Sequence, residues 1–106
     1  MEMSTVSACT YPLIDRSVEE AFAVIAEAGF KKVDLLGRLP HFDVDPEMCD
    51  HKGLKATAEA YGLQIANLGT YLGRGFASPE RAEQERALRE IRQGIDVAVF
   101  LGARSI

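Results

Sequence analysis

The chain has 106 residues, 47% hydrophobic and 26% charged, which is the size and composition of one globular domain and excludes a disordered or fibrous protein. Its 12 Lys and Arg against 16 Asp and Glu give a net charge of −4, so no basic surface is expected for nucleic acid. The sequence has neither an apolar run of the ~20 residues that span a bilayer nor a secretory signal. We therefore expect no membrane contact and a cytoplasmic location.

A short apolar run over 3–8 predicts the first strand, and a helix follows it. Ser17 is the expected N-cap, and Glu20 three residues later completes a capping box. Gly29 is suited to end this helix, because a glycine in the left-handed conformation commonly follows a last helical turn. The predicted buried face consists of Val18, Phe22, Ile25 and Ala26.

Two further units repeat this order of strand and helix. A second strand is predicted over 32–36, with a helix from Asp50 to Gly62 after it, and a third strand over 63–68. The last helix is predicted to start with Ser78 as N-cap and Pro79 at its first position, and to end at Gly102. Its predicted apolar stripe is Leu88, Ile91, Ile95 and Ala98.

The alternation of strands and helices predicts an α/β fold with a parallel sheet. An internal repeat supports this, because Gly29 and Gly62 each precede a strand that carries a polar residue five positions later, Asp34 and Asn67. A third copy begins at Gly102, and the chain ends one residue before the matching position. We expect three βα units and the start of a fourth parallel strand, in a single domain over 1–106 that is truncated in strand four.

The segments 28–36, 61–68 and 100–106 resemble the N-terminal part of sugar phosphate isomerases/epimerases of the xylose-isomerase-like TIM-barrel superfamily. The resemblance implies an N-terminal piece of a TIM barrel, about three-eighths of a typical barrel of ~250 residues. It also implies aldose–ketose isomerisation or ketose epimerisation by proton abstraction next to a carbonyl, with a sugar or sugar phosphate as substrate.

In this family one divalent metal, Mn²⁺ or Mg²⁺, is held by Glu, Asp and His at the ends of later strands. The resemblance therefore implies that these 106 residues hold no metal, contain no catalytic residue and are inactive alone. Endonuclease IV-type relatives carry a metal-binding His at the end of the third strand, whereas 66–70 contain none here. That difference and the acidic charge make a metal-dependent nuclease the less favoured alternative.

In a TIM barrel the carboxyl ends of the strands and the loops after them build the site. Asp34 and Asn67 occupy matching places there and are candidates to bind sugar hydroxyls. The alternative is that Asp34 caps the chain locally or pairs with Lys32 or Arg38. His41, in the loop after the second strand, is a candidate to orient substrate, or else a hydrogen-bonded loop histidine.

The glycine-rich loop 69–76 contains two more candidates. Arg74 could hold a phosphate or carboxylate, and Tyr71 could line the same pocket, with Tyr11 beside it. The alternative is that the glycines only form a turn, and the loop lacks the spacing of a P-loop.

Other titratable residues are expected to have structural or surface roles. Cys9 and Cys49 are predicted to be reduced and structural, and His51 to be a surface residue. The carboxylates Asp43, Asp45, Glu47 and Asp50 lack an EF-hand pattern.

A second hypothesis from a different class is a stand-alone α/β binding module that self-associates. An open sheet of three to four strands leaves unpaired edges and apolar faces that a second copy would cover.

Overall fold

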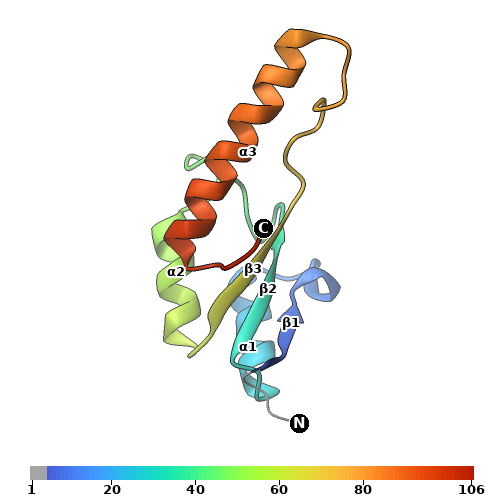
Figure 1. Ribbon diagram of the computed structural model, residues 1–106. Coiled ribbons are helices and arrows are strands. Elements are labelled where there is room, and N and C mark those ends of the chain that lie inside the picture. Colours follow the sequence, from blue (N-terminus) through green and yellow to red (C-terminus); the bar gives the residue numbers. More distant parts are fainter. Residues whose placement is uncertain (1–4) are drawn as a thin grey trace.

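The computed structural model describes residues 5–106 and shows a three-stranded parallel sheet in the order β1-β2-β3 (Figure 1). Each strand is followed by a helix, which confirms the α/β prediction. The elements are β1 (Ser7–Cys9), a single 3-10 turn (Tyr11–Leu13), α1 (Val18–Glu27), β2 (Lys32–Gly37), α2 (His51–Ala60), β3 (Gln64–Thr70) and α3 (Arg81–Leu101). The first strand was predicted over 3–8, of which residues 3 and 4 lie outside the described part. It begins at Ser7, later than predicted, and ends one residue later, at Cys9.

The predicted N-cap of α1, Ser17, is confirmed, and Asp50, where the second helix was predicted to begin, is the N-cap of α2. The Ser17 hydroxyl accepts a hydrogen bond from the Glu20 N–H at 3.1 Å, and the Asp50 carboxylate accepts one from the Gly53 N–H at 3.0 Å. Both side chains thereby satisfy backbone donors that have no partner inside the helix. Gly29 and Gly62 follow the two helices with φ values of 95° and 70°, the left-handed conformation that glycine adopts without steric cost.

The predicted start of α3 is wrong by two residues. Its N-cap is Glu80 and its first residue is Arg81. The Ser78 hydroxyl instead accepts from the Glu80 N–H at 3.1 Å, which closes a local turn before the helix. The Gln84 side chain donates to the Ser78 carbonyl and ties that turn to the first helical turn.

The predicted apolar face of α3 is right for Ala98, which is buried, and wrong for Leu88 and Ile95, while Ile91 is half-buried. Leu88 and Ile95 are exposed, at 39% and 44%, and the buried residues are Ala87, Gly94, Ala98 and Leu101. The reason is close packing, because a Cβ at Gly94 would collide with the end of the Leu72 side chain. Small residues therefore face the protein around Gly94, and α3 extends beyond the carboxyl ends of the strands (Figure 1).

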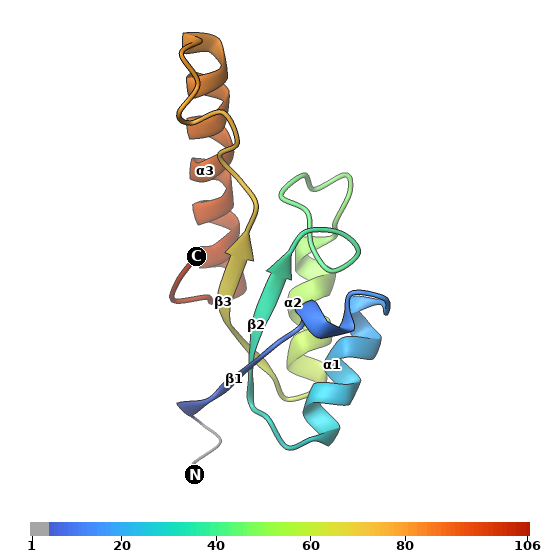
Figure 2. The ribbon, with the colours of Figure 1, turned by 90° about the vertical axis from the view of Figure 1, so that its right-hand side faces the viewer.

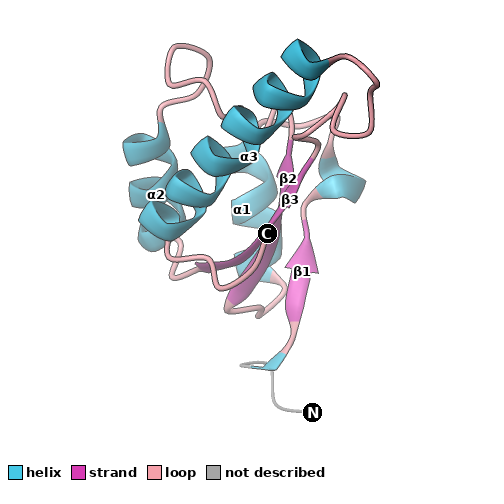
Figure 3. Cartoon of the chain, turned by 45° about the horizontal axis from the view of Figure 1, so that its top comes forward, coloured by secondary structure: helices cyan, strands magenta, loops and turns pink. Residues whose placement is uncertain are grey.

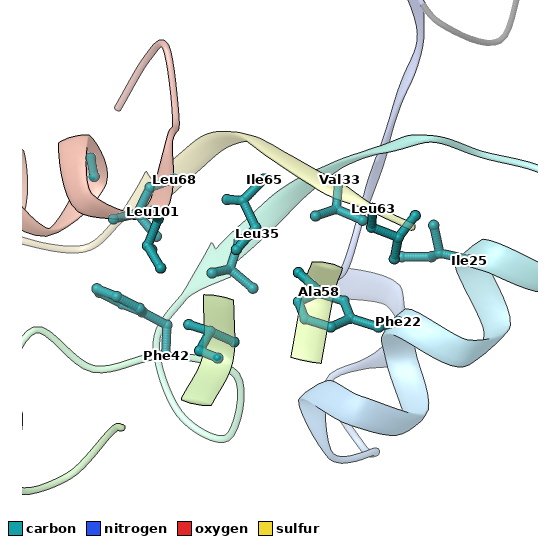
Figure 4. Packing of buried hydrophobic residues seen from close by; sticks show 12 residues of the cluster. Phe22, Ile25, Val33, Leu35, Phe42, Ala58, Leu63, Ile65, Leu68 and Leu101 are labelled. Carbon is teal, nitrogen blue, oxygen red and sulfur yellow. The ribbon is translucent and has the colours of Figure 1, made fainter. Parts of the chain in front are cut away.

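The hydrophobic core lies between the sheet and the helices. α1 and α2 lie on the same side of the sheet, and α3 runs along its β3 edge (Figures 2 and 3). Figure 4 shows the cluster, in which Val33 and Leu35 of β2 lie with Ile65 and Leu68 of β3. It also contains Phe22, Ile25, Phe42, Leu54, Ala58, Leu63, Ala98 and Leu101. Among residues 5–106, no helix covers the other face of the sheet, which we call the open face.

The start of a fourth parallel strand is confirmed. Ser105 forms a parallel bridge with Asn67, and the Leu68 N–H donates to the Ser105 carbonyl at 3.1 Å. The repeat had matched Asn67 to the position after Ile106, so the observed pairing is shifted by two residues. A shift of two keeps the same face, because side chains alternate along a strand. Within the described chain, every helix is too short or too polar to cross a bilayer.

Candidate functional site

Four polar residues occupy paired positions on adjacent strands across the sheet. The register pairs Cys9 with Asp34, Asp34 with Asn67, and Asn67 with Ser105. We call these four residues the polar row. Val33 and Leu35 on either side of Asp34 belong to the core, so the Asp34 side chain points to the open face.

A β-bulge places Asn67 in this row. Val33 pairs with Ile65, but Asp34 pairs with Asn67, so Ala66 is an extra residue in β3. Without the bulge, Ile65 and Asn67 would point to the same face. With it, Ile65 and Leu68 both reach the core while Asn67 turns toward Asp34.

Hydrogen bonds connect three members of the row. The Ser105 hydroxyl donates to the Asn67 Oδ1 at 2.7 Å, and the Asn67 Nδ2 donates to the Asp34 Oδ1 at 2.7 Å. Within residues 5–106, Asp34 forms no ion pair with Lys32 or Arg38. Its second carboxylate oxygen and the second N–H of Asn67 are thus left to accept from and donate to a ligand. Gly69 has no side chain beside Asp34, where an added Cβ would lie 3.6 Å from the Asp34 Oδ1.

This arrangement suits the binding of hydroxyl groups. Each hydroxyl can donate to a carboxylate oxygen and accept from an amide, and the row offers both kinds of group side by side. The Asn67 amide is held in one orientation by its two partners, so the positions of donor and acceptor are set before a ligand arrives.

His41 lies outside this row and is buried, at 1% exposure. Its Nε2 is 3.0 Å from the Arg16 carbonyl oxygen, and its Nδ1 is 3.0 Å from the Thr10 Oγ1. Because a carbonyl only accepts, Nε2 carries the proton and Nδ1 accepts from the Thr10 hydroxyl. That hydroxyl oxygen in turn accepts from the Leu36 N–H at 2.8 Å. Both ring nitrogens are hydrogen-bonded to other residues of the chain, which matches the alternative prediction that His41 is a hydrogen-bonded loop histidine.

Tyr71 and Arg74 are not brought to the row. The Tyr71 ring lies beneath Arg38, whose guanidinium carbon is 5.6 Å from the ring centroid. Arg74 is exposed and forms no ion pair within the described residues. Tyr11, in the 3-10 turn, is exposed as well, and its N–H donates to the Cys9 sulfur at 3.4 Å.

The predictions of a structural role for Cys9 and of a surface position for His51 are wrong, while Cys49 packs against the core as predicted. Cys9 and Cys49 are free thiols, but Cys9 is exposed on the open face and not a packed structural residue. Burial raises the pKa of the half-buried Cys49 thiol. A hydrogen bond with the Asp43 backbone lowers this pKa in part, and the negative charges of Asp43 and Asp50 raise it further. His51 is half-buried: its Nε2 donates to the Asp43 carbonyl and its ring stacks on Phe42.

The described chain provides no ligand set for the divalent metal that the family resemblance implies. Among residues 5–106, no three His, Cys, Asp or Glu side chains converge where they could hold a metal ion. The described residues therefore do not fit a bound metal ion.

The sequence did not indicate Cys9 and Ser105 as neighbours of Asp34 and Asn67, or Arg38 as the neighbour of Tyr71. The polar row needs the strand register, which joins residues 25 to 38 positions apart. Alternation along each strand was the available signal, but it could not show the bulge that aligns the strands.

The comparisons with known proteins agree with this architecture. The family model of the xylose isomerase-like TIM barrel matches residues 22–106. The crystal structure of a xylose isomerase domain-containing protein from Salmonella typhimurium LT2 is similar, with a TM-score of 0.68 and 21% identity. The alignment covers 100% of this chain and 36% of that one, so the chain spans about a third of that protein. At this identity the likeness shows the fold alone. No match was found among curated proteins.

Proposed function

Because the chain belongs to the xylose isomerase-like TIM barrel family, we propose that it forms the substrate-binding N-terminal part of a sugar isomerase or epimerase barrel. The observation that carries the proposal is the polar row on the open face, the face that a closed barrel turns inward. Asp34 accepts from sugar hydroxyls and Asn67 donates to them. The metal and the base that takes the proton next to the carbonyl are supplied by other strands.

This division of roles predicts binding without turnover. Titration of the ¹⁵N-labelled chain with a neutral ketohexose such as fructose is expected to shift the Asn67 side-chain amide signals saturably, with a dissociation constant in the millimolar range. Asp34→Ala is expected to abolish the shift, because the partner of that amide and the hydroxyl acceptor are both lost.

Gln64→Ala, at the other end of the same strand, is the matched control and keeps the shift. No interconversion of ketose and aldose is expected from the purified chain with Mn²⁺ or Mg²⁺ added. An unmoved Asn67 signal would refute the binding role, and turnover would refute the assignment of catalysis to other strands.

We propose self-association as a second function, and the exposed side of α3 favours it. Leu88, Ile95 and Val99 lie on one side of the helix, and Val99 is 71% exposed. The β1 edge and the bridge at Ser105 also leave strand edges unpaired within the described chain. A second copy packed on α3 would bury these apolar side chains.

Light scattering tests this proposal. We expect a mass above that of the monomer that rises with protein concentration, and a return to the monomer mass in the Ile95→Glu/Val99→Glu variant, which places charges in the contact. Val24→Glu, at an exposed apolar position of α1, is the control and is expected to leave the mass unchanged. A monomer at every concentration would exclude self-association.

A further inference from the structure

A cavity lies beyond the polar row, at the carboxyl ends of β2 and β3. It has a volume of about 360 Å³ and lies between Gly37, the loops after the two strands and Glu90 of α3. We call it the rim pocket. Asp34 and Gly37 are three residues apart on β2, which puts the pocket about 10 Å along the strand from the polar row. Its volume is at the lower end of the about 300–1,000 Å³ found for small-molecule sites.

Arg38 is held in this pocket by its backbone and by an aromatic ring. Its carbonyl accepts from the N–H groups of His41 and Phe42, both at 3.0 Å, so the buried His41 anchors the backbone beside the pocket. Its guanidinium lies over the Tyr71 ring. Within residues 5–106 it has no ion-pair partner, which leaves its N–H donors free for a ligand.

Two carboxylates line the same pocket, and each is partly engaged. Asp43 Oδ1 accepts from the Asp45 N–H at 2.8 Å, and Glu90 Oε1 lies 3.5 Å from the Arg86 guanidinium. Each carboxylate keeps an oxygen that can accept from a ligand. Leu72 and Val44 form an apolar part of the wall of the rim pocket.

We propose that the rim pocket binds the uncharged, hydroxyl-bearing end of a sugar and discriminates against a phosphate at that end. A phosphate dianion would gain from Arg38 but would be repelled by Asp43 and by Glu90, whose charge Arg86 offsets in part. A cation would gain from the two carboxylates but would be repelled by Arg38. A neutral polyol avoids both penalties, because its hydroxyls accept from the guanidinium and donate to the carboxylates. This inference rests on the proposed function for the identity of the ligand as a sugar.

The test compares fructose with fructose 6-phosphate in titrations of the ¹⁵N-labelled chain. Fructose is expected to shift the backbone amide signals of Gly37, Arg38 and Leu72 saturably, and fructose 6-phosphate to bind there more weakly. Arg38→Met, which keeps the apolar stem, is expected to abolish both sets of shifts.

The variant Asp43→Asn/Glu90→Gln keeps the side-chain shapes and removes both charges. It is expected to strengthen fructose 6-phosphate binding roughly fivefold or more, from the Coulomb repulsion of one unit charge a few ångströms away in water, while fructose changes less. Tighter binding of the phosphate by the unsubstituted chain, or no saturable shift at the pocket with either ligand, overturns the proposal.

The NMR signals of the polar row and of the rim pocket test the two proposals separately. A shift at the Asn67 side chain without one at Gly37 and Arg38 refutes the rim pocket and leaves the proposed function standing. A shift at Gly37 and Arg38 without one at Asn67 supports the rim pocket and refutes the role of the polar row.

Discussion

Gly37→Ala is expected to lower the free energy of unfolding by about 3 kcal/mol, because it overpacks a place where only backbone atoms could give way. A Cβ at Gly37 would collide with the Gly69 carbonyl oxygen and lie 2.7 Å from the Thr70 Cα. These atoms belong to β3, which is hydrogen-bonded to β2 along its length. Relief would require β2 and β3 to separate at their carboxyl ends, beside the rim pocket. Urea denaturation followed by circular dichroism measures the change.

Gly94→Ala is the matched control. A Cβ at Gly94 would collide with the Leu72 Cδ1, which is the end of a flexible side chain. Leu72 can rotate away, and alanine in a helix interior gains up to about 1 kcal/mol over glycine. We expect this variant to stay within about 1 kcal/mol of the unsubstituted chain. Equal losses in the two variants would contradict the distinction between backbone and side-chain collisions.

His41→Ala is expected to cost about 3 kcal/mol of unfolding free energy, since loss of a buried hydrogen-bond partner costs ~1–3 kcal/mol for each group left unsatisfied. The Arg16 carbonyl loses its donor and the Thr10 hydroxyl loses its acceptor. The imidazole connects the end of β1, the loop after β2 and the turn before α1. Its removal therefore loosens three segments together.

Arg74→Ala provides the control for this variant. Arg74 is exposed and has no ion pair among residues 5–106, so we expect a change within about 0.5 kcal/mol. Both predictions are measured by urea denaturation. If His41→Ala weakened sugar binding at unchanged stability, the structural role of His41 would be refuted and a substrate contact favoured.

Local signals in the sequence were sufficient for the first two helices. The Ser17 and Asp50 side chains cap backbone N–H groups three residues later in the chain. Gly29 and Gly62 follow the two helices because they adopt a positive φ angle without steric cost. These effects do not depend on the rest of the fold. The same reasoning failed at Ser78, because the hydroxyl bonded to an N–H two residues on and formed a turn before the helix.

The apolar face of α3 could not be predicted in this way. The predicted stripe Leu88, Ile91, Ile95 and Ala98 has helical spacing, but only Ala98 of it is buried, beside Ala87, Gly94 and Leu101. Which side of a helix is buried depends on how closely its neighbours approach. Leu72, 22 positions earlier, sets that approach at Gly94.

By itself the sequence determined the α/β class, the two capped helices and the presence of polar residues near the strand ends, because caps, glycines and apolar periodicity act over a few residues. Only the tertiary structure decided which of those residues meet. The bulge at Ala66 aligns Asp34 with Asn67, and the bridge places Ser105 beside Asn67. His41 is hydrogen-bonded to Thr10 in the interior, and Arg38 stacks on Tyr71. Register and side-chain pairing join residues tens of positions apart, and one extra residue in a strand reverses every face after it.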